Sequence, residues 1–380
     1  MKDNKKKKKK IVHLLLSFLL PLVIGAAIGF AISLFNNESA NGADGDLLSF
    51  LITMALMIVF VYVGIILHSI IHETGHLIGG LKSGYKFVSF RILNTIFIKE
   101  NGITKAKKFN IPGTGGQCLM MPPGEEMEKY PYILYNASGS IMNIIASSVF
   151  FALFVFTRNV FMYSSAIFIP LIAIGMVLGI LNILPIKLGG LAVDGYNIKL
   201  MNKNPEARKA FKIMLLANAG LTLGNRFKDM PAHWFDAVAD WDDPISVSIA
   251  LNKFNYYMDT HNFEEAKKLA GEILAKADKI LDMQKKEINC ELLFMEIIGD
   301  KNPDEINRLY DSDLKKYIKA CKTHLSKRRI MYAYEKLITK DTSQAAKALE
   351  MFEKTCLTYP LLGEIEGEKE LIQIIDEKPV

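Results

Sequence analysis

The feature that most constrains this chain is a long window without a positive charge, because no Lys or Arg occurs between Ile11 and Leu81. Two apolar stretches, residues 11–35 and 47–81, fill most of the window. Each is longer than the roughly 20 residues that a helix needs to cross the hydrocarbon core of a bilayer. The window therefore predicts two membrane-spanning helices, joined by a polar loop without cations.

Two further apolar stretches, at about 131–157 and 159–186, contain no charged residue, and Arg158 stands alone between them. Positive residues concentrate in the cytoplasmic loops of membrane proteins. The basic tail, residues 1–10, and the segment 82–129 carry such residues, which places both on the cytoplasmic side. Four spans satisfy every loop, so we expect a multi-pass protein of the cell membrane with both termini in the cytoplasm.

The composition of the 380 residues supports a membrane protein. Hydrophobic residues make up 50% of the chain, and the mean hydropathy is +0.18, which is unusual for a soluble globular protein. The net charge is +6, but seven lysines lie within the first ten residues. The tail is therefore a topology signal, and we expect the lipid bilayer and no nucleic acid as a partner. A cleaved signal peptide is the alternative for the first stretch, although its apolar run is too long.

The remaining segments predict a small β element and a soluble helical half. Residues 83–127 contain two strand-like runs, 85–98 and 116–121, broken by turn residues, which indicates a small sheet or hairpin at the cytoplasmic face. Residues 201–380 are rich in Lys, Glu, Ala and Leu at helical spacing, with helices expected to open at Asn262 and Thr342. This half resembles tetratricopeptide repeats, and a plain helical bundle is the alternative. The predicted fold class is mainly α.

A metal-binding pattern, His72-Glu73-Thr74-Gly75-His76, lies within the second predicted span. Two His four residues apart lie on one helix face and can hold one zinc ion (Zn2+), while the Glu between them can reach a water on the metal. Glu73 is also the only acid of its span, and an unpartnered carboxylate in lipid costs several kcal/mol. We therefore predict a zinc site on this helix, with Glu73 within reach of a water on the metal. The alternative is a pair of His that only form hydrogen bonds between helices.

Asp194 is the favoured third ligand, because catalytic zinc usually has three protein ligands and an open position. It follows the fourth span, after Asn182 and Pro185, at a depth similar to that of His76. Proline and glycine residues there would end the helix and let a carboxylate turn toward a cavity. An ordinary Asp-Gly turn is the alternative interpretation.

The third span contributes Gly139 and Asn143, one helical turn apart. A glycine would let another helix or a substrate approach, and the Asn offers an amide, although ordinary helix packing explains the pair equally well. His68 precedes His72 by one turn on nearly the same face. Its role stays open between a supporting contact, an alternative ligand and a hydrogen-bonded His within the membrane.

Together these motifs resemble the site-2 protease family of intramembrane zinc metalloproteases. The resemblance covers roughly residues 47–200, and it implies that residues 11–200 form the protease domain. By this resemblance His72, His76 and Asp194 bind zinc and Glu73 is the general base. Asn143, Asn182 and Gly139 would position the substrate or stabilise the oxyanion. Unlike many bacterial members, the chain has no PDZ-like insert.

The expected activity is therefore cleavage of a membrane-spanning or membrane-anchored peptide near the cytoplasmic face, in a bacterial cell. The helical domain, residues 201–380, is a possible docking site for a protein partner. Three rivals remain: a zinc protease with a cytosolic catalytic domain, a metal transporter, and a non-proteolytic membrane scaffold acting through the helical domain. A purely structural zinc site needs no general base, so Glu73 argues against the scaffold.

Overall fold

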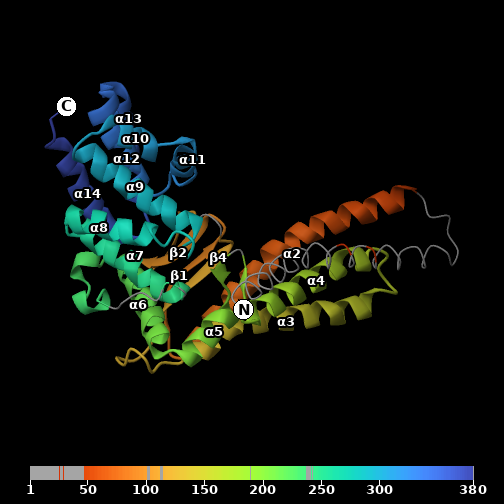
Figure 1. The fold of residues 1–380 in the computed structure, drawn as a ribbon. Helices are drawn as coiled ribbons and strands as arrows, with labels where there is room; N and C mark the ends of the chain where they lie inside the picture. The colour runs from red at the N-terminus through yellow and green to blue at the C-terminus, as the bar shows by residue number, and fades with distance from the viewer. Residues whose placement is uncertain are drawn as a thin grey trace, which may run out of the picture. The chain divides into compact units, whose positions relative to one another are not determined.

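The computed structural model describes residues 47–100, 103–111, 114–188, 190–236, 241 and 243–379, together with Gly25 and Gly29. The basic tail and the first predicted span, residues 11–35, lie outside the described residues. The chain divides into two compact units. The first combines residues up to Ser83 with Pro131–Leu200, and the second combines Gly84–Tyr130 with Met201–Val380 (Figure 1).

Three long helices make up most of the first unit as described. They are α2 (Leu47–Lys82), α3 (Tyr132–Thr157) and α4 (Ser164–Ile183), and each packs against the other two. A two-stranded hairpin, β5 (Lys187–Leu188) and β6 (Leu191–Ala192), follows and leads into α5 (Asp194–Lys203). All three long helices are long and apolar enough to cross a membrane. Three of the four predicted spans are thereby confirmed as apolar helices.

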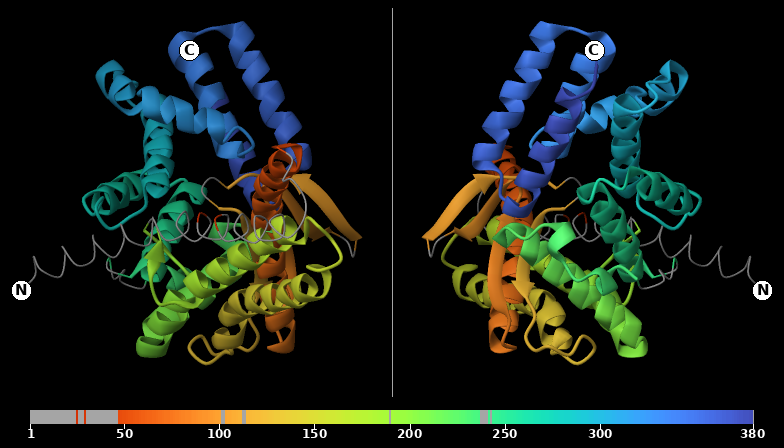
Figure 2. Two further views of the ribbon diagram at one scale, coloured as in Figure 1. Left: turned by 90° about the vertical axis from the view of Figure 1, so that its right-hand side faces the viewer. Right: turned by 90° about the vertical axis from the view of Figure 1, so that its left-hand side faces the viewer.

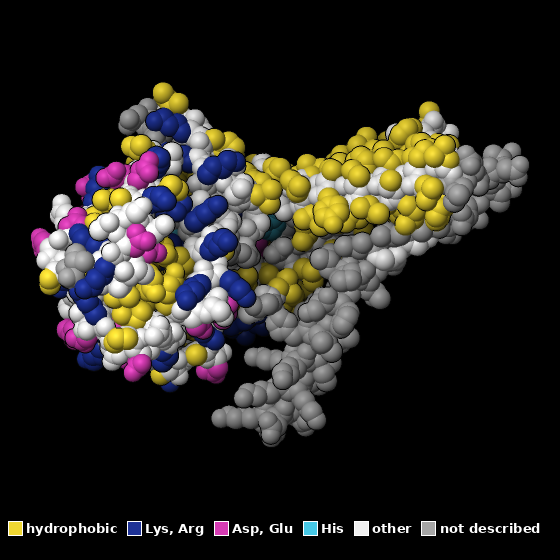
Figure 3. Space-filling model, turned by 90° about the horizontal axis from the view of Figure 1, so that it is seen from above, with side chains coloured by type: hydrophobic (Ala, Val, Ile, Leu, Met, Phe, Trp, Pro, Cys, Tyr) yellow, Lys and Arg dark blue, Asp and Glu magenta, His cyan; other side chains and the backbone are white. Residues whose placement is uncertain are grey.

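The outer surface of these helices is apolar, which suits contact with lipid. Side chains such as Tyr62, Val149 and Phe156 are exposed by 68%, 54% and 79%. Figure 3 shows hydrophobic side chains over much of the visible face of the long helices. A protein surrounded by water rarely exposes an apolar area of this extent, so the surface is consistent with a membrane protein.

Small residues let the three helices approach closely. A Cβ added at Gly75 or Gly79 of α2 would overlap Ser138 of α3, and one at Gly179 of α4 would lie 2.8 Å from Ile144. Without a hydrophobic driving force between helices in lipid, such close contacts supply much of the packing energy. The close approach of α2 to α3 is what brings the metal-binding pattern against the third span.

The segment predicted as a β element is a four-stranded antiparallel sheet in the order β3-β2-β1-β4. Its strands are β1 (Lys86–Ile92), β2 (Thr95–Glu100), β3 (Ile103–Lys108) and β4 (Gly116–Met121). We expected residues 85–98 to be one continuous run, but a turn at Leu93 divides it. Leu93 adopts a φ of 52°, so the chain reverses there and β1 pairs with β2.

The sheet belongs to the same compact unit as the C-terminal helices. Lys212 of α6 is 1% exposed, and its ammonium donates to the carbonyls of Pro123, Gly124 and Glu126 at 3.2, 2.7 and 2.9 Å. His324 Nε2 lies 2.7 Å from the Asn110 carbonyl, in the loop between β3 and β4. The Lys212 ammonium and the His324 imidazole thus fasten loops of the sheet to the helices.

The C-terminal half is helical, as predicted, and several of its consecutive helices pack on one another (Figure 2). The α-helices are α6 (Pro205–Leu223), α7 (Pro244–Asp259), α8 (Phe263–Leu274), α9 (Asp282–Ile298), α10 (Pro303–Leu309), α11 (Ser312–Ala320), α12 (Leu325–Tyr334), α13 (Thr342–Thr358) and α14 (Leu362–Asp376). Shorter turns are η1 (Phe227–Asp229), η2 (Ala232–Trp234) and η3 (Glu335–Thr339). The helix starts predicted at Asn262 and Thr342 are confirmed. The last helix, α14, packs on α6, so the array closes on itself.

Candidate metal centre

The three predicted metal ligands come together at one point in the first unit. His72 and His76 lie one turn apart on α2, and Asp194 is the first residue of α5. The Nε2 atoms of the two His are 3.1 Å apart. Asp194 Oδ2 lies 3.2 Å from His72 Nε2 and 3.4 Å from His76 Nε2. Among the described residues, this is the one group of three or more His, Cys or acidic side chains whose geometry could hold a metal ion.

The chain path after α4 explains how Asp194 reaches the helix that carries the two His. Helix α4 ends at Ile183, because Pro185 cannot continue it. The β5–β6 hairpin then turns the chain back. A Cβ on Gly195 would overlap the Ile183 carbonyl, so only glycine lets the start of α5 lie against the end of α4. The prediction that Pro and Gly residues break the chain here is confirmed.

Hydrogen bonds on the far side of each imidazole orient its Nε2 toward the shared point. His76 Nδ1 lies 2.7 Å from the Tyr135 carbonyl, which can only accept, so Nδ1 carries the proton and Nε2 is free to bind a metal. The carbonyl belongs to the backbone of α3, and nothing in the sequence marks Tyr135 for this role.

Asn143 supports His72 in the same way. One end of its amide lies 3.4 Å from His72 Nδ1 and the other lies 3.2 Å from His68 Nδ1. His68 Nε2 must donate to the Leu171 carbonyl at 2.9 Å, so a neutral His68 accepts at Nδ1. The structure places Asn143 Oδ1 toward His68 and Nδ2 toward His72. Turning the amide by 180° lets its nitrogen donate to His68 Nδ1 and its oxygen accept the Nδ1 proton of His72. His68 is completely buried and belongs to this supporting network.

The electrostatics of the group are compatible with a bound cation. Asp194 Oδ2 is buried without a hydrogen-bond partner, although two imidazole nitrogens face it. Burial would raise the pKa of the Asp194 carboxyl, but His76 and His72 hold it well below its ordinary value. The group is therefore a carboxylate, and a metal ion would satisfy this oxygen and both nitrogens at once.

The remaining predicted site residues take different places. Gly139 of α3 lies against the metal group, since a Cβ there would be 2.7 Å from both His72 Cε1 and His76 Nε2. Glu73 is half-buried on α2 between the two His. Asn182 donates its amide to the Leu178 carbonyl of its own helix at 2.9 Å. The described contacts thus join Gly139 and Asn143, but not Asn182, to the three ligands.

The chain was compared with known protein families, curated proteins and solved structures. No family model, no curated protein and no solved structure matches the chain.

Proposed function

We propose that this chain is a zinc metalloprotease that cleaves membrane-spanning or membrane-anchored peptides within the bilayer. One observation carries the proposal. Three ligand atoms converge within 3.4 Å of one another, and two of them come from a helix that is long and apolar enough to cross a membrane. That same helix carries an acid between the two His.

The spacing of the ligand atoms supports zinc as the metal. Zinc binds nitrogen and oxygen ligands at about 2.0–2.1 Å in a tetrahedron, so two ligand atoms of one ion lie roughly 3.3 Å apart. The three separations here are 3.1, 3.2 and 3.4 Å. Two imidazoles and one carboxylate also leave a fourth position open, as in catalytic zinc sites.

The residues of the chain would share the chemistry as follows. Zinc, when bound, supplies a Lewis acid that lowers the pKa of a water from 15.7 to about 7. Glu73 takes the proton of the attacking water and passes it to the leaving amine. Asn143 and the Tyr135 carbonyl hold His72 and His76 in the tautomers that bind metal. Gly139 keeps the space beside the ligands free of a side chain.

The apolar helices around the site favour substrates that reach it from the membrane. A helical substrate must unwind before its carbonyl can be attacked, because helical backbone is hydrogen-bonded and shielded. The cations of residues 82–129 favour a cytoplasmic exit for α2, so cleavage would occur near the cytoplasmic face of a bacterial cell membrane. The proposed topology is multi-pass, with four spans and both termini in the cytoplasm.

A cleavage screen tests the proposal. The full chain is co-expressed with a library of tagged single-span membrane proteins, as wild type, Glu73→Gln and Asp194→Asn. Ser69→Ala is the matched control, because Ser69 lies on the same helix outside the metal-binding pattern and its hydroxyl donates to the Ile65 carbonyl of that helix. We expect products with wild type and Ser69→Ala, and none with Glu73→Gln or Asp194→Asn. Products that persist in Glu73→Gln at the wild-type level would exclude the proposed mechanism.

A further inference from the structure

The sheet of the second unit has one face that is partly exposed. Ile96 and Ile98 of β2 are exposed by only 3% and 1%, and they belong to the same apolar core as the C-terminal helices. Successive side chains of a strand point to opposite faces, so Phe97 and Lys99 lie on the other face. Phe97 is 39% exposed, and Lys99 is exposed as well. Strand β2 thus presents an aromatic ring and an ammonium group away from this core.

Strand β3 extends this exposed face. Its Lys108 is paired with Thr95, and its Thr104 with Lys99, and the side chains of directly paired residues share a face. Lys108 Nζ donates to Thr95 Oγ1 at 3.2 Å, so its ammonium lies on this face. An ammonium has three donors, so two remain for other acceptors. We call the surface formed by Thr95, Phe97, Lys99, Thr104 and Lys108 the basic face.

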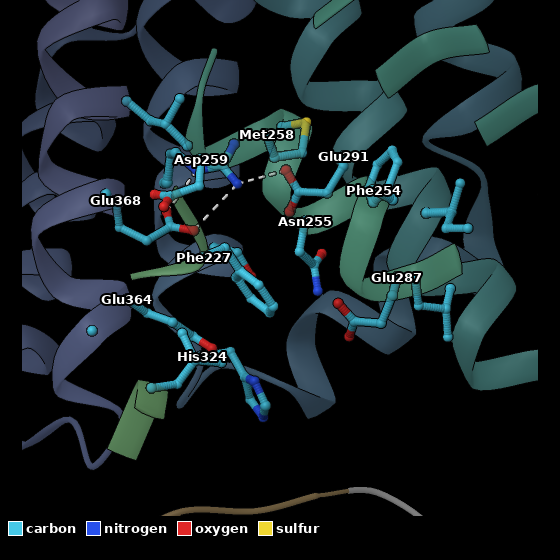
Figure 4. Close-up of a pocket in the computed structure, with 18 of the residues that line it drawn as sticks. Phe227, Phe254, Asn255, Met258, Asp259, Glu287, Glu291, His324, Glu364 and Glu368 are labelled. Carbon is cyan, nitrogen blue, oxygen red and sulfur yellow. Dashed lines mark hydrogen bonds and ion pairs between the residues drawn. The ribbon is translucent and has the colours of Figure 1, made fainter. Parts of the chain in front are cut away.

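The charge of the sheet differs from that of the helical part of its unit. Residues 86–121 contain six Lys and Arg and one acid, whereas residues 201–380 contain 28 Lys and Arg and 30 Asp and Glu. Several acids of the helical part line a cavity, among them Glu287, Glu364 and Glu368 (Figure 4). An anionic partner is therefore attracted to the sheet more than to the helices.

The chain connections keep the sheet within reach of a membrane surface. Strand β1 begins at Lys86, four residues after the end of α2 at Lys82, and α2 is long and apolar enough to cross a membrane. An extended chain spans at most about 3.6 Å per residue, so Lys86 lies within about 14 Å of the last residue of α2. After the sheet, residues 122–131 lead into α3, a second helix of this kind. The sheet is thus inserted between two such helices.

Protection of a strand edge explains only part of the basic face. Lysines on an edge strand such as β3 discourage pairing with another chain. Lys99, however, lies on β2, which is paired on both sides, and an exposed Phe97 does not discourage contact. Aromatic rings beside lysines are typical of surfaces at a membrane interface, where the ring lies at headgroup level and the ammonium reaches anionic lipid.

We propose that the basic face binds the anionic headgroups of phospholipids in the leaflet where α2 ends. Lys99 and Lys108 donate to phosphate oxygens, and Phe97 lies at the level of the headgroups. Each lysine near an anionic surface favours binding about fivefold. The contact requires that α2 and α3 lie in a membrane, but it requires neither zinc nor protease activity.

Fluorescence quenching tests the proposal with the full chain in lipid nanodiscs. Thr104→Cys carries a fluorophore on the basic face, and a fixed fraction of the phosphatidylcholine carries a nitroxide on its headgroup. The nanodiscs contain either phosphatidylcholine alone or a mixture with phosphatidylglycerol. We expect the nitroxide to quench about twice as strongly or more in the mixture, because anionic headgroups hold the basic face at the surface. Equal quenching in the two membranes overturns the proposal.

Charge variants locate the contact on the basic face. Lys99→Gln combined with Lys108→Gln removes both ammonium groups and should abolish the extra quenching caused by phosphatidylglycerol. Lys268→Gln combined with Lys354→Gln is the matched control, because it removes the same charge from exposed positions of α8 and α13. The control should keep the extra quenching. A wild-type response of the first double variant would contradict the assignment, and the readout is independent of the proposed protease activity.

Discussion

At the scale of single residues, Gly139 is the position where one methyl group should disable the metal centre. A Cβ there would lie 2.7 Å from His72 Cε1 and from His76 Nε2, which are ligand rings held on their far sides. Overpacking of this kind costs about 1–3 kcal/mol, and 1.4 kcal/mol corresponds to a factor of ten in affinity. We expect Gly139→Ala to lower zinc affinity about tenfold or more, measured by competition with a chelator.

Gly271 provides the control for that substitution. It lies on α8 with no atom within 4 Å of an added Cβ. Gly271→Ala should leave zinc affinity unchanged and raise helix stability by roughly 0.5–1 kcal/mol, because Ala restricts the unfolded chain. Equal zinc affinities of Gly139→Ala and wild type would show that the ligands do not occupy the space beside Gly139.

Glu364 predicts a pH dependence of stability. Burial raises its pKa from the ordinary 4.5 to about 7; Tyr359 and Lys327 oppose the rise, while Glu368 and Glu287 add to it. The folded state thus holds a proton that the unfolded state has released, so its contribution to stability is lost as pH rises from about 4.5 to 7. Glu364→Gln stays neutral. We expect the unfolding free energy, measured by urea titration, to fall between pH 5 and pH 8 in wild type. In Glu364→Gln this fall should be smaller by about 1–3 kcal/mol. Identical losses would contradict the raised pKa.

The ligands differ in how far the sequence could predict them. His72 and His76 follow from helical spacing alone, and Asp194 required the expectation that Pro and Gly residues end α4. Asn143 was expected to serve the substrate, and its sequence position did not predict that its amide also lies between His68 and His72. The Tyr135 carbonyl could not be predicted, since every residue has a backbone carbonyl and only the packing of α3 selects this one.

At the scale of elements, the contact between α6 and the loop after β4 depends on Lys212. Its buried ammonium donates to three carbonyls of residues 123, 124 and 126. Lys212→Met keeps the apolar stem but leaves these carbonyls without their donor. We expect a loss of about 2–3 kcal/mol in unfolding free energy. The two tryptophans, Trp234 and Trp241, both belong to the second unit, so their fluorescence in urea can report it.

Lys268→Met serves as the control for Lys212→Met. Lys268 is 68% exposed and lies 3.9 Å from Glu265 on the same helix. Its replacement should change stability by less than about 0.5 kcal/mol. If the two variants unfolded at the same urea concentration, the contacts of Lys212 would contribute nothing to stability.

Elements with strong periodic signals were predicted well, and those set by local backbone geometry were not. The long apolar runs predicted α2, α3 and α4 with bounds close to the observed ones. The polar residues at Asn262 and Thr342 predicted where α8 and α13 begin. The turn at Leu93 was missed because its one turn-forming residue, Asn94, stands between apolar and β-branched residues and no glycine marks the positive φ of Leu93. The sheet was expected within the membrane domain, and the contacts of its loops group it with the C-terminal helices.

At the scale of the whole molecule, the charge distribution predicts which segments face the cytoplasm. Val160 and Leu357 are exposed by 87% and 83%, one in the turn after α3 and one near the end of α13. We expect a membrane-impermeant maleimide to label Val160→Cys in intact spheroplasts and Leu357→Cys only after permeabilisation. The native cysteines give little background, because three are buried and Cys356 is half-buried. The reverse labelling pattern would invert the proposed topology.

The zinc content of the purified full chain, measured by mass spectrometry, tests the central claim most directly. We expect roughly one zinc per chain in wild type and in His233→Ala, a variant of an exposed His in the second unit, because three ligands define one site. His72→Ala and Asp194→Asn should retain little or none. A wild-type chain without zinc, or zinc retained in full by both ligand variants, would contradict the proposed metal centre and the protease built on it.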